Sequence, residues 1–490
     1  MLRSFGTVGW ILLGLVLTVW PAGPKGFAQT AASAHEDQAS PSAKPDETAG
    51  TPLADRLTKS AGWPRFRGPN GQGQAEADAL PVQWNEQDYL WKIRLPGSGH
   101  SSPVVSGHRV LITAAQEDGT LWLLCVDAPT GKILWQKSRS LEVHRLHPYN
   151  SYASSTPAVD AERVYWCYAQ PKRYVVEALR LQDGEPIWQA DLGAFESEHG
   201  FGASPIVADG LVVVANEQDG QSSVAALDAQ TGRLRWQCPR RSEKTVYATP
   251  CVYRPAQGPV QVIAVSWAHG PSGIELQSGK PLWELPVLKY RVVGSPVVVG
   301  DVIICASGVG GIGKQMVGVR PGNPATGAKA ELLYEVPLPV PYVCTPVAHG
   351  ELLFAWVDKG GVVSCLEAAS GKLLWREKVG GEYFSSPIRV GNRLYNISRD
   401  GQMVVLAAEK QFKLLARFPL GEGTHATPAV ADGVMYIRTL THLMALASPK
   451  AQRPPSATEP ANSLSPADSP SPGGCSVRFS ASAPGTISRM

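Results

Sequence analysis

The sequence predicts an all-β fold, an eight-bladed β-propeller built from four-stranded antiparallel blades. A Ser/Thr-Pro pair followed by apolar residues recurs eight times along the 490 residues, at intervals of roughly 40 to 55 residues, which is the period of propeller blades. Each period contains four short runs of β-branched and aromatic residues separated by turn residues. The repeated prolines are Pro103, Pro157, Pro205, Pro250, Pro296, Pro346, Pro387 and Pro428.

The first unit, residues 101–138, shows the order of these signals. Its runs "PVV", "RVLIT", "LWLLCV" and "KILWQ" are typical of four strands joined as a meander. A proline lacks a donor N–H and is tolerated at strand starts, so the Ser/Thr-Pro pair marks where the chain enters the innermost strand. The turn "DAPTG" ends in Gly131, which can adopt a positive φ without steric cost.

A large aromatic residue follows the corresponding turn in most units, usually four residues after the glycine. We expect these rings to pack where neighbouring blades meet. A tryptophan in the strand before the first unit occupies the same register, and a tyrosine replaces it in the fifth unit. The predicted blade-docking residues are Trp91, Trp135, Trp188, Trp236, Trp283, Tyr334 and Trp375.

The last unit predicts how the ring closes. Its sequence "HATPAVADGVMYIRTLTHLMALAS" supplies about three strands, and the segment "YLWKIRLPG" at 89–97 has the pattern of a fourth strand without a blade of its own. Pairing this N-terminal strand with the C-terminal strands closes the ring and leaves only short, protected edges. The sequence therefore predicts a propeller over residues 84–447.

The flanking segments predict export. Residues 1–34 contain an early arginine, an apolar run and small residues, which is a signal peptide pattern, so we expect a periplasmic or cell-envelope protein. A membrane contact would come only from a signal segment that is not cleaved. Residues 35–61 and 448–490 are rich in Ala, Pro and Ser and are predicted to be a disordered linker and tail. Residues 62–83 are predicted to be an extension packed on the propeller.

The units "VDAPTGKILWQ" and "LDAQTGRLRWQ" resemble the quinoprotein-type, or PQQ-like, propeller repeat. That family contains quinoprotein alcohol dehydrogenases and the BamB-type scaffold of outer-membrane assembly. The segment "GWPRFRGPNGQGQ" at 62–74 resembles, more narrowly, the exported PQQ-like repeat proteins abundant in planctomycete-type bacteria. The resemblance implies the fold, but a shared fold does not imply a shared chemistry.

The resemblance to the dehydrogenases can be tested on residues. It implies an adjacent Cys-Cys pair, a Ca²⁺ ion held by Glu and Asn, and an Asp base, but the eight cysteines here include no adjacent pair and the sequence contains no Dx[DN]xDG loop. We therefore predict no catalytic residue and no cofactor, and interpret the chain as a monomeric scaffold for an envelope protein or small ligand. A PQQ- or metal-dependent oxidoreductase is the alternative. The net charge of +3 and the lack of a basic stripe argue against nucleic acid.

Ligands of propellers bind where loops lead into the inner strands, at the mouth of the central channel. The candidates immediately before the Ser/Thr-Pro pairs are His100, Tyr152, Phe201, Tyr247, Arg291, Tyr342, Tyr383 and His425. A second cluster in the longest interval would place His144, His147 and Asn150 opposite Glu198 and His199. If the two loops meet, this cluster either fixes them as a polar network or binds a metal such as Zn²⁺.

Overall fold

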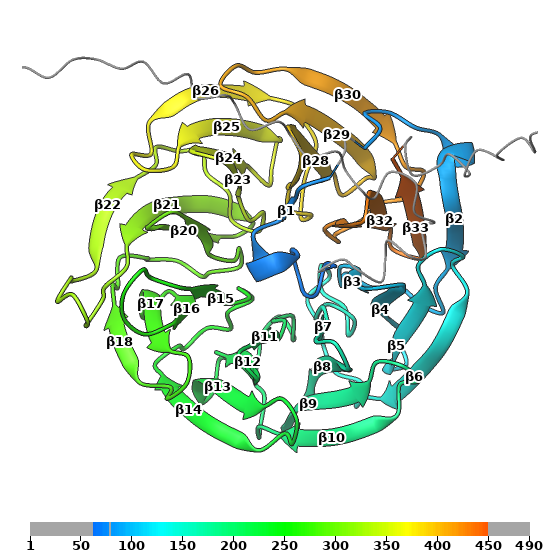
Figure 1. The fold of residues 1–490 in the computed structure, drawn as a ribbon, viewed down its shortest axis with the longest axis horizontal. Helices are drawn as coiled ribbons and strands as arrows, with labels where there is room; N and C mark the ends of the chain where they lie inside the picture. The colour runs from blue at the N-terminus through cyan, green and yellow to red at the C-terminus, as the bar shows by residue number, and fades with distance from the viewer. Residues whose placement is uncertain (1–61, 78–79, 449–490) are drawn as a thin grey trace, which may run out of the picture. The chain divides into compact units, whose positions relative to one another are not determined.

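The computed structural model describes residues 62–77 and 80–448. The predicted signal peptide, linker and tail lie outside the described residues. The eight-bladed propeller is confirmed: eight antiparallel sheets surround a central channel, each with its shortest strand innermost (Figure 1). Among the described residues, the helices are too short to be candidates for crossing a membrane.

The first four blades follow the chain in order. Blade 1 contains β3 (Val104–Ser106), β4 (Arg109–Ala115), β5 (Thr120–Asp127) and β6 (Ile133–Ser140). Blade 2 contains β7 (Ala158–Val159), β8 (Arg163–Gln170), β9 (Arg173–Arg180) and β10 (Pro186–Asp191). Blade 3 contains β11 (Ile206–Ala208), β12 (Leu211–Asn216), β13 (Ser222–Asp228) and β14 (Leu234–Arg240). Blade 4 contains β15 (Cys251–Tyr253), β16 (Gln261–Ser266), β17 (Gly270–Glu275) and β18 (Pro281–Glu284).

The remaining blades complete the ring. Blade 5 contains β19 (Val297–Val299), β20 (Val302–Val309), β21 (Ile312–Arg320) and β22 (Glu331–Glu335). Blade 6 contains β23 (Val347–His349), β24 (Leu352–Trp356), β25 (Val362–Glu367) and β26 (Leu373–Lys378). Blade 7 contains β27 (Ile388–Val390), β28 (Arg393–Ile397), β29 (Gln402–Ala407) and β30 (Leu414–Pro419). Blade 8 contains β31 (Ala429–Ala431), β32 (Val434–Arg438) and β33 (His442–Ala447).

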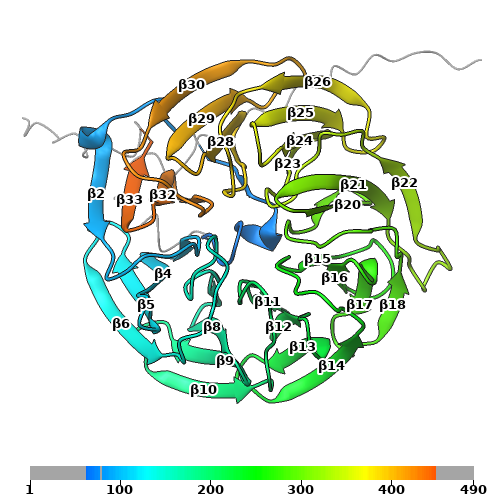
Figure 2. The ribbon, with the colours of Figure 1, turned by 180° about the vertical axis from the view of Figure 1, so that it is seen from behind.

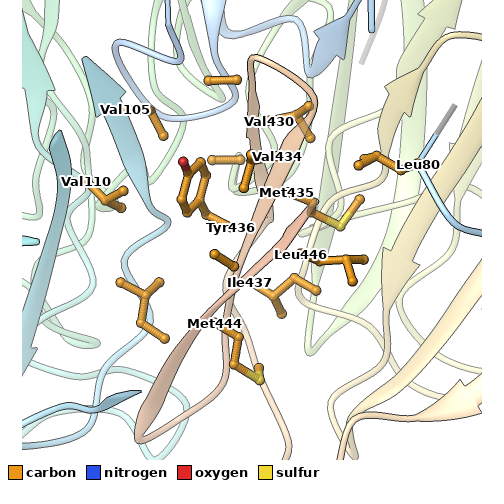
Figure 3. Packing of buried hydrophobic residues seen from close by; sticks show 14 of the residues in the cluster. Leu80, Val105, Val110, Val430, Val434, Met435, Tyr436, Ile437, Met444 and Leu446 are labelled. Atoms are coloured by element: carbon orange, nitrogen blue, oxygen red, sulfur yellow. The ribbon is translucent and has the colours of Figure 1, made fainter. Parts of the chain in front are cut away.

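The closure predicted from the sequence is confirmed, because β2 (Tyr89–Arg94) pairs antiparallel with β33 as the outer strand of blade 8. Apolar side chains fill the seam on both sides of that blade. Figure 3 shows Val110 of blade 1 near Tyr436, with Met435 and Leu80 on the far side of β32. The buried Arg438 donates to the Ser101 and Thr113 carbonyl oxygens at 3.1 and 2.8 Å, so polar bonds also join blades 8 and 1.

The repeated aromatic residues lie where one blade meets the next. Trp236, for example, donates its indole N–H to the Leu276 carbonyl of the following blade at 2.9 Å. Gly279 lies against the same ring, and a Cβ on this glycine would stand 2.5 Å from it, so only glycine fits. The same kind of bond to a carbonyl oxygen of the next blade is made by Trp91, Trp135, Trp188, Tyr334 and Trp375. Trp283 instead donates to the Gln261 side chain of its own blade.

The Ser/Thr of each Ser/Thr-Pro pair has a role that the sequence did not reveal. Its hydroxyl oxygen accepts the backbone N–H of the equivalent residue in the preceding blade, for example Thr345 from Ser295 at 2.9 Å. Seven of the eight steps around the ring carry this bond, with N–H to oxygen distances of 2.9 to 3.0 Å. We call these eight residues the hydroxyl belt: Ser102, Thr156, Ser204, Thr249, Ser295, Thr345, Ser386 and Thr427.

The N-terminal extension, residues 62–77, lies across the centre of the ring and is visible there from both sides (Figures 1 and 2). It contains the short helix η1 (Pro69–Gly71) and β1 (Gln74–Ala75), and β1 pairs parallel with β27 as a fifth strand of blade 7. Beyond it, η2 (Glu86–Asp88) leads into β2. The seven cysteines of the described residues are all buried and unpaired.

Candidate functional site: a central cavity with one open end

A cavity of about 810 Å³ occupies the middle of the ring. Six members of the hydroxyl belt line its wall, and the loops that lead into the inner strands form its mouth. Phe66 of the extension also lines the cavity. The cavity is therefore built from four parts: the belt, the leading loops, turns between the second and third strands of several blades, and the extension.

The extension closes one end of the channel. Its backbone pairs with residues that follow the belt along the inner strands: Trp63 with Val105 in blade 1, and Gly73 with Arg389 in blade 7. The Asn70 side chain bonds the backbone of Val252 in blade 4. The leading loops precede the belt, so the extension and the mouth lie on opposite sides of the belt. Within residues 62–77 and 80–448, the way into the cavity therefore runs through the leading loops.

Two buried arginines hold the extension in place. Arg67 donates to the carbonyl oxygens of Pro346 and Pro387 at 2.8 and 2.9 Å, and Arg65 donates to that of Pro250. These prolines belong to the Ser/Thr-Pro pairs of blades 4, 6 and 7. Burial lowers the pKa of Arg67 to about 9 and that of Arg65 to about 10, because desolvation disfavours the charged guanidinium; both values stay above 7, so both side chains are charged at neutral pH.

The loop between blades 1 and 2 reaches over the mouth. We call residues 142–152 the crossing loop. Its Tyr149 contacts Phe384 of blade 7, with ring centroids 5.3 Å apart, and the Arg399 guanidinium lies 4.2 Å from the Tyr149 ring centre. On its other side, Asn150 donates to the His199 carbonyl at 2.6 Å. The crossing loop therefore spans the mouth from blade 3 to blade 7.

Four of the ten histidines line this cavity, arranged as two pairs. The rings of His100 and His425 are 4.2 Å apart, and those of His147 and His199 are 4.7 Å apart. Burial lowers the pKa of His425 to about 4, with the Arg399 charge as the second cause, and lowers that of His100 to about 2. Both rings of the first pair are therefore neutral at pH 7.

The charges at the mouth divide into paired and unpaired groups. Arg291 bonds Glu198 at 3.2 Å and Arg399 bonds Glu382 at 2.8 Å. The buried Asp358 accepts the backbone N–H groups of Tyr342, Val343 and Cys344, so its charge holds the leading loop of blade 6. In contrast, Lys244, Lys289 and Lys359 are exposed and have no carboxylate within ion-pair distance among the described residues.

Eight of the eleven ligand-binding candidates line the cavity: His100, His147, Asn150, His199, Tyr247, Arg291, Tyr342 and His425. Three do not, and for these the expected placement is wrong. Tyr383 is fully buried between blades 6 and 7, and Phe201 packs against Tyr174 and Phe195. Tyr152 instead bonds the backbone of His144 in its own loop.

The residue two positions before each belt hydroxyl lines the cavity in all eight blades. Tyr383 and Phe201 stand one residue earlier, where the alternation of side chains along extended chain turns them into the packing between blades. Farther from the belt the path of each loop decides, since Arg291 lines the cavity from four positions before its belt residue and Tyr152 does not. In blade 7 the residue two positions before the belt hydroxyl of Ser386 is Phe384, which was not among the predicted candidates. The cavity-lining residues at this position are His100, Ser154, Gly202, Tyr247, Val293, Val343, Phe384 and His425. Sequence reasoning also missed Tyr149, Lys244, Trp267, Lys289, Tyr290, Lys359 and Arg399, which come from loops with no repeat signal.

The two loops of the predicted His cluster do meet, since His147 and His199 are in contact. His144, however, turns to Tyr152 and bonds the carbonyl of Glu142. Across residues 62–77 and 80–448, no group of three or more His, Cys, Asp or Glu side chains is placed to hold a metal ion. The arrangement of the cluster is that of a polar network fixing two loops.

This architecture defines the class of protein: a closed eight-bladed propeller with a central cavity open at one end. The family described as "Outer membrane protein assembly factor BamB" matches residues 82–200, 125–324 and 340–446, which together cover more than half of the chain. The chain belongs to this PQQ-like, BamB-type propeller family.

Relatives with curated descriptions are outer membrane protein assembly factors BamB. That of Burkholderia pseudomallei (strain K96243) is 26% identical over 279 residues, covering 52% of this chain and 66% of the relative, so the match spans about two thirds of its length. That of Yersinia pestis is 22% identical over 304 residues, covering 58% of this chain and 72% of the relative.

Solved structures share the fold. BamB from Moraxella catarrhalis has a TM-score of 0.53 at 17% identity, covering 73% of this chain and 96% of that one. A europium-containing methanol dehydrogenase has a TM-score of 0.58 at 12% identity, covering 78% of this chain and 90% of that one. At these identities the likeness concerns the fold alone.

Proposed function

We propose that this protein is an exported, non-enzymatic scaffold of the cell envelope that binds a small ligand or a segment of a partner protein in its central cavity. The observation that carries the proposal is the cavity of about 810 Å³, closed by the extension at one end and open through the leading loops. Its volume falls within the range of about 300 to 1,000 Å³ that is usual for ligand sites.

The carboxylates of the cavity wall favour a binding role over a catalytic role. The two carboxylates at the mouth, Glu198 and Glu382, are bonded to arginines, and Asp358 is bonded to three backbone N–H groups. These bonds argue against a carboxylate acting as general base. The membership in a family described as an assembly factor also favours a scaffold in the envelope.

A cavity-filling variant tests the binding role. Val293 lines the cavity, and a Val293→Trp substitution places a large ring there. The matched control is Leu373→Trp on the outer strand of blade 6, where the side chain is 43% exposed. After chemical cross-linking in cells, the wild type and the control are expected to yield the same defined adduct, and Val293→Trp to lose it. Equal adducts from all three proteins would contradict the proposal.

The second candidate function is a PQQ- or metal-dependent oxidoreductase, favoured by the fold likeness to the methanol dehydrogenase. It is tested on protein lacking residues 1–34, titrated with PQQ and Ca²⁺ by absorbance and calorimetry, with elemental analysis for bound metal. Stoichiometric quinone binding would overturn the scaffold proposal and make alcohols and sugars the substrates to try. The scaffold proposal expects no saturable quinone binding.

A further inference from the structure

The mouth of the cavity carries more positive charge than its own carboxylates neutralise. Five cationic side chains line it: Lys244, Lys289, Arg291, Lys359 and Arg399. Among the described residues, only the two arginines form ion pairs with carboxylates. The three lysines belong to blades 4 to 6, on the arc that the crossing loop leaves open. An oxyanion of a ligand would find three ammonium donors there.

The deep wall also presents hydrogen-bond donors. Each belt hydroxyl oxygen that lines the cavity and bonds its neighbour does so as an acceptor of a backbone N–H. The proton of these hydroxyls has no acceptor among the described residues. Five belt residues can therefore donate their hydroxyl proton to a ligand in the cavity: Thr156, Ser204, Thr345, Ser386 and Thr427. This suits a ligand rich in oxygen acceptors.

Aromatic rings supply flat apolar faces between these polar groups. Tyr290 lines the cavity beside Lys289 and Arg291 and is 36% exposed, so part of its ring is accessible. Tyr247 and Trp267 line the same side of the cavity and are half-buried. Ring faces next to hydrogen-bonding groups bind molecules that have both an apolar face and polar edges.

A ligand made only of oxyanions would leave the ring faces without a counterpart. A sugar with acidic substituents matches all three features: ring faces for the tyrosines, oxygens for the belt, and negative charge for the lysines. Building on the proposed function, we infer that the cavity binds a short acidic oligosaccharide, whose carboxylate or sulfate groups pair with Lys244, Lys289 and Lys359.

The test is calorimetric titration of the full chain without residues 1–34. The probes are trigalacturonate, a sulfated trisaccharide, a neutral galactotriose and an Asp-rich tripeptide. The expected result is saturable binding of one or both acidic sugars, weakened by added salt because exposed charges are screened, and at least about 10-fold weaker binding of the neutral sugar. The two acidic probes separate a carboxylate from a sulfate ligand.

A triple variant, Lys244→Gln, Lys289→Gln and Lys359→Gln, is expected to weaken binding about 10- to 100-fold, since each exposed pair contributes modestly. The matched control replaces three exposed lysines of the outer turns, Lys132, Lys280 and Lys413, with glutamine and removes the same total charge. Tyr290→Ala is expected to weaken binding by loss of the ring face alone. These positions are exposed or on loops, so circular dichroism should show each variant folded.

The outcomes separate the inference from the function on which it rests. Failure of both acidic sugars to bind, equal binding of the neutral sugar, or preference for the tripeptide would overturn the acidic-sugar inference. Loss of the cross-linked adduct in Val293→Trp would still support the scaffold in that case. Equal weakening by the control lysine variant would show a general charge effect and would also overturn the inference.

Discussion

Replacing a belt threonine by valine tests what holds neighbouring blades together. Thr345 is 1% exposed, and its hydroxyl accepts the Ser295 N–H at 2.9 Å. Valine has nearly the same shape but cannot accept this bond, so Thr345→Val leaves a buried N–H without a partner. A stranded buried donor costs about 1 to 3 kcal/mol, partly offset by about 0.8 kcal/mol for the added methyl group.

The chain supplies its own control at the one belt residue whose hydroxyl does not accept this bond. Thr249 is 2% exposed, but the structure gives its hydroxyl no bond from the preceding blade. Thr249→Val therefore gains the methyl group without stranding an N–H. The difference between the two variants isolates the hydrogen bond, and we expect Thr345→Val to be less stable than Thr249→Val by about 1 to 3 kcal/mol.

Equilibrium urea unfolding followed by tryptophan fluorescence and circular dichroism measures this difference. For a chain of this size the corresponding shift in Tm is only roughly 1 to 4 °C, which makes the denaturant midpoint the more sensitive quantity. Thr156→Val and Thr427→Val should behave like Thr345→Val, because their hydroxyls accept equivalent bonds. Equal stabilities of all four variants would refute the belt as a source of stability.

Three further outcomes are expected. Arg67→Met removes the bonds to the Pro346 and Pro387 carbonyls, and amide hydrogen exchange in residues 62–77 should accelerate about 10- to 100-fold, whereas an unchanged rate would show that the arginine does not hold the extension. His425 is neutral when folded, with a pKa of about 4, but titrates near 6.5 when unfolded, so its contribution to stability is full above pH 6.5 and falls by about 3 kcal/mol as the pH drops to 4. Because the still lower pKa of His100 causes a loss of its own over the same range, His425→Gln should make the pH profile of urea midpoints shallower without flattening it, and an unaltered profile would contradict the assignment. Gly279→Ala should cost about 1 to 3 kcal/mol more than Gly327→Ala, because both glycines have φ near +71° but only the first Cβ would meet a tryptophan ring, and equal urea midpoints would contradict this reasoning.

The pattern of residues was sufficient to predict the propeller, the number of blades and the closing strand. These features depend on signals within one period: a proline that must start a strand, a glycine that must end a turn, and strand runs between them. The tryptophan position followed from the same period. Since each blade repeats the local signal, the prediction did not depend on knowing which distant residues touch.

The candidate site was predictable where it followed that repeat, and where the longest interval gathered polar residues such as His147 and Asn150. His100, Tyr247 and His425 stand two positions before a belt hydroxyl and line the cavity, as does Phe384, which replaces the neighbouring Tyr383. The lysines of the mouth stand at no repeated position. Their contribution depends on the path of individual loops, which the sequence does not encode in a short pattern.

Contacts between distant parts of the chain were decided by the tertiary structure alone. The Thr427 N–H reaches the Ser102 hydroxyl only because the ring closes, and Arg67 reaches the Pro387 carbonyl only because the extension crosses the channel. Ring closure brings together residues more than 300 positions apart, and their side chains then complete bonds that no local segment could form. The sequence thus determined the repeating blade, whereas the closed ring determined the belt, the closed end and the cavity.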